Sequence, residues 1–513
     1  MANTDSWGSR VGLILAMAGN AVGLGNFLRF PVQAIQNGGG AFIIPYLVCF
    51  LLMGIPLLWV EWSMGRFGGR KGNHSTPFIL HEMDPKRAMW KYIGVFGIFT
   101  NLAVAAYYCY LESWTLSYIW HSIAGSFNGQ TADQVAGFFS NYVDINTTTT
   151  GIPFEPIVFW LICLALNTWI LAQGLSGGVE KVAKIGMPLL IIFGIFLAVK
   201  AVTLTAGENG AINDGTVGLN FLWTPDYSSI WSAKVWLAAA GQIFFTLSVG
   251  MGSIHCYASY VKKKDDIALN AMSAGWMNEF VEVVLGASII IPISIGYLGI
   301  DRVVELTQSG GLGLGFKTLP YLFTQWGPTL ALIAGVCWFG LLFFAGITSS
   351  LAMGTPVMGF LKDEFGWKHK PAAWFFGLLI LILGLPTVIW FPAVFDEYDY
   401  WAGTVSLVVF ALVEIILFAW VFGMDKGWKE ITTGADIKVP TIFRLIIKFV
   451  TPLFLGFVFI MSLPGIWDKI TDTSAPWQVH ASRVLLLVLF LTICWFVRVA
   501  YLKRKAAFKP THR

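Results

Sequence analysis

The sequence predicts an all-α integral membrane protein of about twelve transmembrane helices. Of its 513 residues, 56% are hydrophobic and only 12% are charged, whereas about a quarter of the residues of a soluble domain are charged. A helix needs roughly 20 mainly apolar residues to cross the hydrocarbon core of a bilayer. Segments of this kind begin near residues 10, 41, 90, 155, 179, 233, 268, 328, 371, 398, 441 and 476. We expect them to form one transmembrane domain over residues 1–513 rather than several domains.

The first predicted span carries a break. The residues Gly19-Asn-Ala-Val-Gly-Leu-Gly-Asn26 lie inside an apolar stretch from Val11 to Phe27, and Arg29 follows them. A backbone group without a hydrogen-bond partner costs several kcal/mol in hydrocarbon, so a broken helix persists only where protein or a cavity surrounds it. The break therefore indicates a functional site inside the bundle.

The sixth span repeats this pattern. Val22-Gly-Leu-Gly-Asn26 has a counterpart in Val249-Gly-Met-Gly-Ser253, and an offset of five spans gives the two segments opposite orientations. Matched interrupted helices in two halves are typical of transporters with an inverted repeat and a binding site at the midplane. We expect 5+5 spans with unwound helices 1 and 6, in repeats of about 8–201 and 233–424, with helices 11 and 12 appended at about 441–504.

Polar residues beside the two breaks favour a cation site. Glycine patterns recur by chance, and Gly19-x-x-x-Gly23 alone is an ordinary helix-packing motif, so the pattern by itself leaves site and packing open. The oxygen-bearing residues embedded in these and two later spans are Asn20, Asn26, Thr246, Ser248, Asn278, Thr348 and Ser349. Each alone is explained equally well as a contact between helices, but together they offer the oxygen ligands that hard cations require. No cluster of His and Cys suggests a transition-metal site.

Four glutamates lie within predicted spans: Glu61, Glu112, Glu279 and Glu282. Ionisable residues inside a membrane are costly, so each is a functional hypothesis; for Glu61 and Glu112, a structural tie to backbone or water is the alternative. The segment Gly174-Leu-Ser-Gly-Gly178 fits the hydrolase pattern G-x-S-x-G. It lies between two predicted helices without the strand that this pattern needs, so we interpret it as a turn and expect no enzyme.

Basic residues predict the orientation. Lys and Arg crowd the loop after the second span and are absent between Lys91 and Lys181, which includes the loop of residues 128–150. By the positive-inside rule, the first loop is cytoplasmic, the second is external and both termini are cytoplasmic. The net charge of +4 follows from this topology. No folded basic surface suggests a nucleic-acid partner; the expected partners are the lipid bilayer and a small molecule.

Four ordered motifs resemble those of the neurotransmitter:sodium symporter family, most closely the bacterial leucine transporter. The motifs are Asn20-Ala-Val-Gly-Leu-Gly-Asn-Phe-Leu-Arg-Phe-Pro31, Gln242-Ile-Phe-Phe-Thr-Leu-Ser248, Ala345-Gly-Ile-Thr-Ser-Ser350 and Asp396-Glu-Tyr-Asp-Tyr-Trp-Ala-Gly403. The likeness runs from about Trp7 through the last span. It implies a multi-pass protein in the plasma (inner) membrane of a bacterium, as a monomer or loose homodimer.

The resemblance also implies an amino-acid site. The carboxylate of the amino acid is expected at the backbone of Leu24 and Gly25 and at the hydroxyl of Tyr108, because helix-end amides suit an anion. The groups expected around its amino group are the carbonyls of Ala21 and Phe245 and the region of Thr246 and Ser248. The residues expected to line the side-chain pocket are Val104, Phe245, Met251, Ser349 and Met353.

Two sodium ions are implied by the same resemblance. The first has as expected ligands the Ala21 carbonyl, Asn26, Thr246, Asn278 and the carboxylate of the bound amino acid. The second has the carbonyls of Gly19, Val22 and Ala345 together with Thr348 and Ser349. Because the carboxylate belongs to both the amino acid and the first ion site, binding of either ligand raises the affinity for the other by the same factor.

Gates are implied on both sides of this site. Arg29 and Asp399 match the external gate, although an ordinary exposed ion pair is the alternative. The inner gate is matched by Trp7, Ser259, Tyr260 and Asp363. Thr4 stands where an arginine is common and Thr355 where the leucine transporter has glutamine, so we expect Arg10 or a lysine to substitute, or the inward-facing state to be more populated.

The predicted function is a sodium-coupled symporter for hydrophobic or aromatic amino acids that works by alternating access. Glu282 matches the position at which chloride-dependent relatives bind chloride, which predicts chloride-independent transport. Met251 and Met353 are adaptable side chains that favour a broad or bulky substrate range; leucine, methionine, tyrosine and tryptophan all remain open. A proton-coupled amino-acid transporter of the same fold, with Glu282 or Glu112 titrating, is the alternative. A channel is disfavoured by the expected gate.

Overall fold

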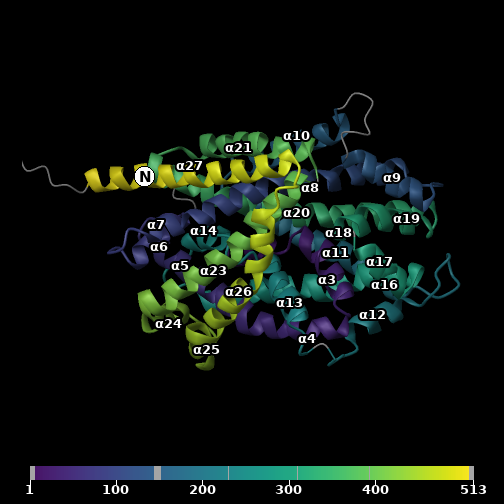
Figure 1. Cartoon of the computed structure of the whole chain (residues 1–513), viewed down its shortest axis with the longest axis horizontal. Coiled ribbons are helices and arrows are strands. Elements are labelled where there is room, and N and C mark those ends of the chain that lie inside the picture. The colour runs from purple at the N-terminus through teal and green to yellow at the C-terminus, as the bar shows by residue number, and fades with distance from the viewer. Residues whose placement is uncertain (1–5, 144–151, 229, 309, 392, 508–513) are drawn as a thin grey trace, which may run out of the picture.

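The computed structural model describes residues 6–143, 152–228, 230–308, 310–391 and 393–507, and all regular elements within these ranges are helical. Most of the helices run side by side along the longest axis of the molecule (Figure 1). In the described part, ten helices are long and apolar enough to cross a membrane, and a bent pair of helices at the start of the chain makes an eleventh. This confirms the predicted all-α membrane fold.

The first five spans end at residue 202. Span 1 consists of α1 (Arg10–Ala21), α2 (Leu24–Leu28) and α3 (Phe30–Gln36), and span 2 of α4 (Gly40–Cys49), the π-helical segment η1 (Phe50–Gly54) and α5 (Ile55–Gly69). Helices α6 (Thr76–Met83) and α7 (Trp90–Ile93) lead to span 3, α8 (Val95–Ala124). After α9 (Ala132–Val143), span 4 is α10 (Phe154–Leu171), and span 5 is η3 (Leu175–Val179) with α11 (Glu180–Val202). Of the segment that fits G-x-S-x-G, only Gly174, at φ 87°, lies outside a helix. The other four residues lie in η3, so the segment begins span 5 and is not the predicted turn.

The second five spans follow α12 (Gly215–Trp223). Span 6 is α13 (Ala233–Leu247) with α14 (Ser253–Ser259), and span 7 is α15 (Ile267–Glu279), η4 (Phe280–Gly286) and α16 (Ala287–Leu298). The helices α17 (Ile300–Thr307), α18 (Gly311–Gly313), η5 (Leu314–Thr318) and α19 (Leu319–Thr324) precede span 8, α20 (Pro328–Phe365). Span 9 is α21 (His369–Ile389), and span 10 runs through α22 (Ala393–Tyr400), η6 (Trp401–Val405), α23 (Ser406–Ile416), η7 (Leu417–Gly423) and α24 (Met424–Thr432).

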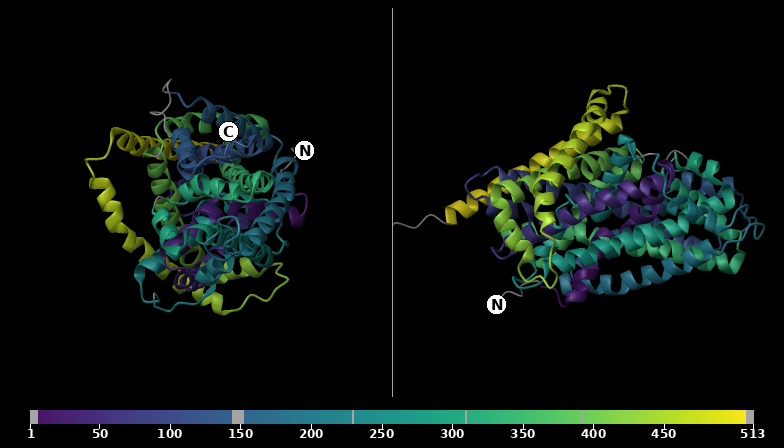
Figure 2. Two further views of the ribbon diagram at one scale, coloured as in Figure 1. Left: turned by 90° about the vertical axis from the view of Figure 1, so that its right-hand side faces the viewer. Right: turned by 90° about the horizontal axis from the view of Figure 1, so that it is seen from below.

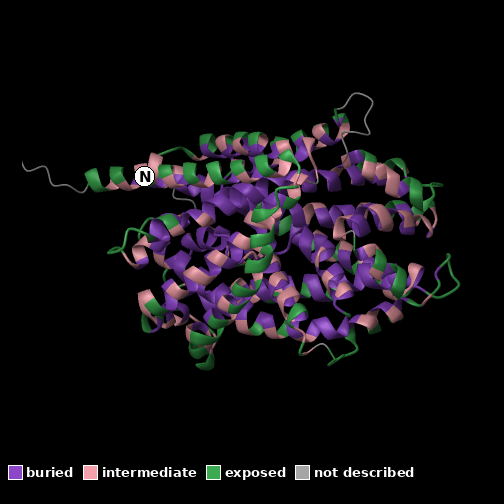
Figure 3. Cartoon of the chain, in the orientation of Figure 1, coloured by how far each residue is buried: buried purple, intermediate pink, exposed green. Residues whose placement is uncertain are grey.

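The last two spans lie at the edge of the bundle. They are α25 (Ile442–Leu445) with η8 (Ile446–Val450) and α26 (Thr451–Thr471), and then α27 (Trp477–Ala507). Both run along one side of the other helices (Figure 2), and large apolar side chains such as Leu453 and Leu487 on them are exposed. The central helices are instead largely buried (Figure 3). Spans 11 and 12 are therefore additions to a ten-span core, with apolar outer faces suited to lipid.

Span 1 is broken where the sequence predicts it. Helix α1 ends at Ala21, and α2 begins at Leu24 after two extended residues, Val22 and Gly23. The axes of α1 and of the segment Leu24–Gln36 differ by 53°. The amide of Gly23 donates to Oδ1 of Asn26 at 2.8 Å, so a side chain from the next turn satisfies a backbone group that the break exposes.

Span 6 is broken by residues in the left-handed region of backbone space. Ser248, Gly250 and Gly252 have φ values of 54°, 73° and 93°. Only glycine adopts such values at little cost, and a Cβ at Gly250 would also lie 2.4 Å from the carbonyl oxygen of Leu407. Neither α13 nor α14 is long enough to cross a bilayer alone, so together they complete the twelve predicted spans.

A buried ion pair ties span 2 to α24, the last helix of span 10. Arg66 on α5 is fully buried, and its Nε donates to Oε1 of Glu430 at 2.9 Å. The guanidinium also donates to the carbonyls of Asp265 at 2.7 Å and Thr433 at 3.1 Å. Arg70 donates to the other carboxylate oxygen of Glu430 at 2.8 Å. The pair therefore joins three segments that are far apart in the sequence.

Replacing Glu430 with alanine is expected to destabilise the protein by about 3–5 kcal/mol, because it leaves the Arg66 charge buried without a counter-charge. Thermal unfolding of the purified protein in detergent measures this. The exposed pair of Arg302 and Glu305, whose atoms lie 2.6 Å apart, provides the control: Glu305→Ala should leave the unfolding midpoint unchanged. Equal midpoints for the two variants would contradict the structural role of Arg66.

Candidate functional site

The two helix breaks face each other in the middle of the bundle. Oγ of Ser248, in the break of span 6, donates to the carbonyl of Asn20 in span 1 at 3.0 Å. On the side of span 6 toward α5, the amide of Gly250 donates to Oε1 of Glu61 at 2.6 Å. Glu61 is thus a structural tie to the backbone, one of the two alternatives that the sequence left open for it.

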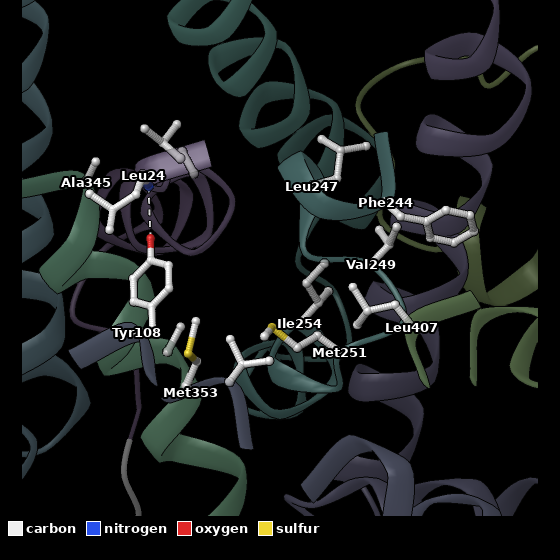
Figure 4. Close-up of a cluster of buried hydrophobic side chains, with 14 of the residues drawn as sticks. Leu24, Tyr108, Phe244, Leu247, Val249, Met251, Ile254, Ala345, Met353 and Leu407 are labelled. Carbon is white, nitrogen blue, oxygen red and sulfur yellow. Dashed lines mark hydrogen bonds between the residues drawn. The ribbon is translucent and has the colours of Figure 1, made fainter. Parts of the chain in front are cut away.

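Tyr108 of span 3 lies at the start of α2. Its hydroxyl oxygen accepts a hydrogen bond from the amide of Leu24 at 2.9 Å (Figure 4). A Cβ at Gly23 would lie 2.6 Å from this oxygen, and a Cβ at Gly25 would lie 2.2 Å from Cε1 of Phe245. Glycine at both positions therefore lets the backbone of span 1 approach the two aromatic rings.

A narrow cavity lies between the breaks. It is lined by Ala21, Gly23, Asn26, Val104, Tyr107, Tyr108, Phe245, Ser248, Met251, Ser349, Met353, Gly403 and Leu407. The side chains of Met251 and Met353 point toward the same space (Figure 4). Eight of the eleven residues expected to bind the amino acid line this cavity. Of the other three, Leu24 and Gly25 line the neighbouring vestibule, and Thr246 lies in a polar cluster described below.

A wider vestibule of about 610 Å³ adjoins the cavity. Tyr107, Tyr108 and Phe245 line both spaces. Arg29 and Asp399 line the vestibule; the Arg29 guanidinium lies 4.4 Å above the ring of Phe245, and Asp399 accepts from the hydroxyl of Tyr107 at 2.7 Å. Among the described residues, Arg29 and Asp399 are not within ion-pair distance of each other. In this conformation the two residues of the expected gate therefore have different partners.

Four polar side chains from three spans form one buried cluster. Nδ2 of Asn26 donates to Oγ1 of Thr246 at 3.0 Å and to Oδ1 of Asn278 at 2.8 Å. Thr246 in turn donates to Oε2 of Glu282, and Glu282 also accepts from the hydroxyl of Tyr46 at 2.7 Å. Three residues expected at the first ion are thus in direct contact, with a carboxyl group immediately behind them. Oxygen ligands without His or Cys fit a hard cation.

A second group of oxygens joins span 1 to span 8. Oγ of Ser349 lies 3.1 Å from the carbonyl oxygen of Gly19 and 3.2 Å from that of Val22. Thr348 donates to the carbonyls of its own helix, including that of Ala345 at 3.3 Å, and a Cβ at Gly19 would lie 2.8 Å from Cβ of Thr348. All five residues expected at the second ion are therefore in one place, and this set also fits a hard cation.

At the other end of the site, the bundle is closed by several contacts. Nε1 of Trp7 donates to the carbonyl of Tyr257 at 3.1 Å. Asp363 accepts from the amide of His74 at 2.7 Å, and the ring of His74 stacks on Tyr260 at 4.2 Å and contacts Ser259 at 2.7 Å. The four residues expected at the inner gate thus lie within two groups of contacts. His74 was not foreseen as a member of either.

Arg10 is engaged elsewhere. It pairs with Asp266 at 3.6 Å and Asp436 at 3.1 Å, and it donates to Oδ1 of Asn270 at 2.8 Å. Thr4, which stands where an arginine is common in the family, lies outside the described residues. Thr355 is buried, and its hydroxyl donates to the carbonyl of Ala352 at 2.7 Å within α20.

Sequence analysis missed several residues of this region. Tyr107, Gly403 and Leu407 line the cavity without having been expected there; Gly403 ends a motif already identified, and Tyr107 is adjacent to Tyr108. It also missed that Glu61 lies beside His255 and Glu414. These three residues come from three spans and share no local motif, so no pattern in the sequence could associate them.

Broken helices that meet around a cavity at the middle of a bundle are the architecture of secondary membrane transporters. A model of the sodium:neurotransmitter symporter family matches residues 4–136 and 124–504. The chain therefore belongs to this family, and it is a sodium-dependent multi-pass membrane transporter rather than an enzyme.

Similar proteins cover nearly the whole chain. A sodium-dependent transporter of Methanocaldococcus jannaschii is 32% identical over 88% of this chain and 89% of its own length. The sodium-dependent nutrient amino acid transporter 1 of Drosophila melanogaster is 25% identical over 90% of this chain and 78% of its own length. The crystal structure of MhsT in complex with L-phenylalanine has a TM-score of 0.76, with 29% identity over 89% of this chain and 99% of that chain.

Replacing Gly25 with alanine is expected to weaken ligand binding at the cavity about 10- to 100-fold, because the new Cβ displaces Phe245 from between cavity and vestibule. Binding of a radiolabelled ligand to purified protein measures the change. Gly241→Ala is the matched control on the same helix as Phe245, since a Cβ there meets no atom within 4 Å. Equal affinities of the two variants would show that the close approach at Gly25 is unimportant.

Proposed function

We propose that the protein is a sodium-coupled symporter of hydrophobic or aromatic amino acids that is independent of chloride and works by alternating access. The observation that carries this proposal is the chemistry of the cavity. One end offers the hydroxyl of Tyr108 beside the start of α2, and the rest is mainly apolar, with Val104, Met251 and Met353. A small carboxylate with an apolar side chain fits both ends.

The substrate binds with its carboxylate toward the backbone of Leu24 and Gly25 and the hydroxyl of Tyr108. That hydroxyl accepts from the Leu24 amide, so its own proton is available to donate. The amino group faces the carbonyls of Ala21 and Phe245. Two methionines in the pocket support a broad range of side chains, and the L-phenylalanine in the related MhsT structure supports an aromatic substrate.

Two sodium ions accompany the substrate in this proposal. The first is bound at the cluster of Asn26, Thr246 and Asn278 with the Ala21 carbonyl and the substrate carboxylate. The second is bound by the carbonyls of Gly19, Val22 and Ala345 with Thr348 and Ser349. Bound sodium would neutralise the substrate carboxylate inside the bundle, which makes the two affinities depend on each other reciprocally.

Arg29 and Asp399 are assigned to the external gate, with Phe245 and Tyr108 beneath them. The distribution of basic residues supports an external gate and cytoplasmic termini, in the plasma membrane of a bacterium. The ten core spans form repeats of about 8–201 and 233–424. A monomer or loose homodimer suffices, because the described chain supplies every group of the site by itself.

Competition against radiolabelled L-phenylalanine in sodium is expected to identify the substrates. Leucine, methionine, tyrosine and tryptophan should compete, whereas glutamate and lysine should bind at least about 100-fold more weakly, because the mainly apolar cavity gives a second charge no counter-charge. Binding should disappear when N-methylglucamine replaces sodium. Uptake driven by an acid-outside gradient without sodium would instead support the proton-coupled alternative, and strong competition by glutamate would contradict the substrate class.

Glu282→Ser is expected to make transport depend on chloride. The Glu282 carboxylate accepts from Tyr46, Gln242 and Thr246, so its removal leaves three donors around a site suited to a small anion. Sodium-driven uptake is measured with chloride or with gluconate; the parent should be equally active in both, and the variant only with chloride. Glu112→Gln, which changes a buried carboxyl beside Asn167, is the control that keeps chloride independence. Chloride dependence of the parent would contradict the proposal.

A further inference from the structure

Three ionisable side chains meet behind the broken part of span 6. Nδ1 of His255 on α14 lies 3.4 Å from Oε2 of Glu61 on α5, and Nε2 lies 3.4 Å from Oε2 of Glu414 on α23. All three side chains are fully buried. One atom from each group can be chosen so that all three lie within 4.8 Å of one another. The imidazole ring thus lies between two carboxyl groups in the interior of the bundle.

The ordinary charge states of these residues do not suit such a place. Two carboxylates and a neutral imidazole carry a charge of −2, and charges without partners are costly to bury. Five atoms have no hydrogen-bond partner: Glu61 Oε2, both ring nitrogens of His255 and both carboxyl oxygens of Glu414. A neutral imidazole has only one ring N–H, so it cannot donate to both carboxylates. The cluster is therefore one proton short of a closed hydrogen-bond chain.

We propose that Glu61, His255 and Glu414 form a buried proton-binding site, with the added proton on Glu414. In this arrangement the Glu414 carboxyl donates to Nε2 of His255, and the Nδ1–H of His255 donates to Glu61. The imidazole's own N–H supplies the hydrogen for the contact with Glu61, and the added proton supplies the hydrogen for the contact with Glu414. The added proton also reduces the charge of the cluster from −2 to −1. No further group or co-reactant is needed.

The proton belongs on Glu414 rather than on Glu61 because their other contacts differ. Oε1 of Glu61 already accepts from the amide of Gly250 at 2.6 Å, and a donated hydrogen bond favours the charged form of a carboxyl group. Both oxygens of Glu414 lack such a donor. The negative charge therefore resides on Glu61, where it holds the backbone of span 6.

The other neighbours of His255 leave this assignment intact. Helix α14 also packs against α1, α6 and α20, but within the described ranges no acidic side chain from these helices lies within ion-pair distance of the imidazole. The ring of Phe410 lies 6.0 Å from that of His255. A metal ion is less suitable than a proton, because the two ring nitrogens face different carboxyl groups and an ion binds only one of them.

The proton site acts on the substrate cavity through Gly250. This residue lies between Ser248 and Met251, which both line the cavity, and Glu61 fixes its amide. Loss of the proton would place a second negative charge, on Glu414, next to Glu61 and would disturb the hydrogen bond between Glu61 and the Gly250 amide. The existence of the proton site is independent of the proposed function; only its effect on binding relies on it.

Infrared difference spectroscopy of purified protein tests the proton directly. The spectrum of the parent minus that of Glu414→Gln should contain the C=O stretch of a protonated carboxyl group, and this band should shift in D₂O. The corresponding difference for Glu61→Gln should contain carboxylate bands instead. Absence of a protonated-carboxyl band from the Glu414 difference would overturn the proposal. This test needs no substrate, so its failure is distinct from failure of the transport function.

Binding of radiolabelled substrate in sodium gives a second test with the same matched pair. Glu61→Gln should weaken binding about tenfold, because a neutral amide oxygen holds the Gly250 amide less strongly than a carboxylate does. Glu414→Gln resembles the protonated acid in shape and charge and should have the smaller effect. The reverse order would overturn the assignment. If Glu61→Gln does not fold, the infrared result on Glu414→Gln alone decides.

Elemental analysis distinguishes a proton from a metal. The parent, purified without chelators, should contain no transition metal at one ion per chain. One zinc, manganese or iron ion per chain that is lost in His255→Leu would overturn the proposal in favour of a metal site.

Discussion

The structure depends on one constraint: backbone groups exposed by a broken helix inside a membrane need partners from the protein. Side chains near each break provide these partners. Asn26 accepts from the amide of Gly23 in span 1, and Glu61 accepts from the amide of Gly250 in span 6. Ser349 lies against the carbonyl of Gly19 near the end of α1 and that of Val22 within the first break. Two of these residues, Asn26 and Ser349, also line the cavity, whereas Glu61 does not. At the first break, the same residues therefore serve both the fold and the site.

A buried network of hydrogen bonds links the two halves of the bundle. Asn26 of span 1 donates hydrogen bonds to Thr246 of span 6 and to Asn278 of span 7, and Thr246 donates to Glu282. Buried hydrogen bonds in one network polarise one another. A ligand that moves one side chain of this network would therefore alter the hydrogen bonds of the other side chains. Direct contact between residues of both halves would allow the proposed ion and substrate sites to share binding free energy.

The sequence was sufficient to predict where the two helices break, but not to predict which side chains contact each other around the breaks. The glycine pattern of span 1 and its counterpart in span 6, together with the polar residues beside them, predict both breaks, and the ordered motifs bring the oxygen-bearing residues together. The association of Glu61, His255 and Glu414 depends on how three helices are rotated, which no local pattern records. The same holds for Arg29 and Asp399, whose partners in this conformation are Phe245 and Tyr107 rather than each other.

The contacts at the two ends of the site differ in kind, and this bears on the proposed alternation. At the closed end, Glu180 accepts from the amide of Gly8 at 2.6 Å and from the hydroxyl of Ser9 at 2.9 Å, which fixes the start of α1. At the open end, Asp399 is held by a single hydroxyl, that of Tyr107. Closing the vestibule exchanges one hydrogen bond for an ion pair, whereas opening the other end separates a charge-assisted cluster from backbone. In the proposed alternation, the second step therefore breaks more hydrogen bonds of this chain than the first does.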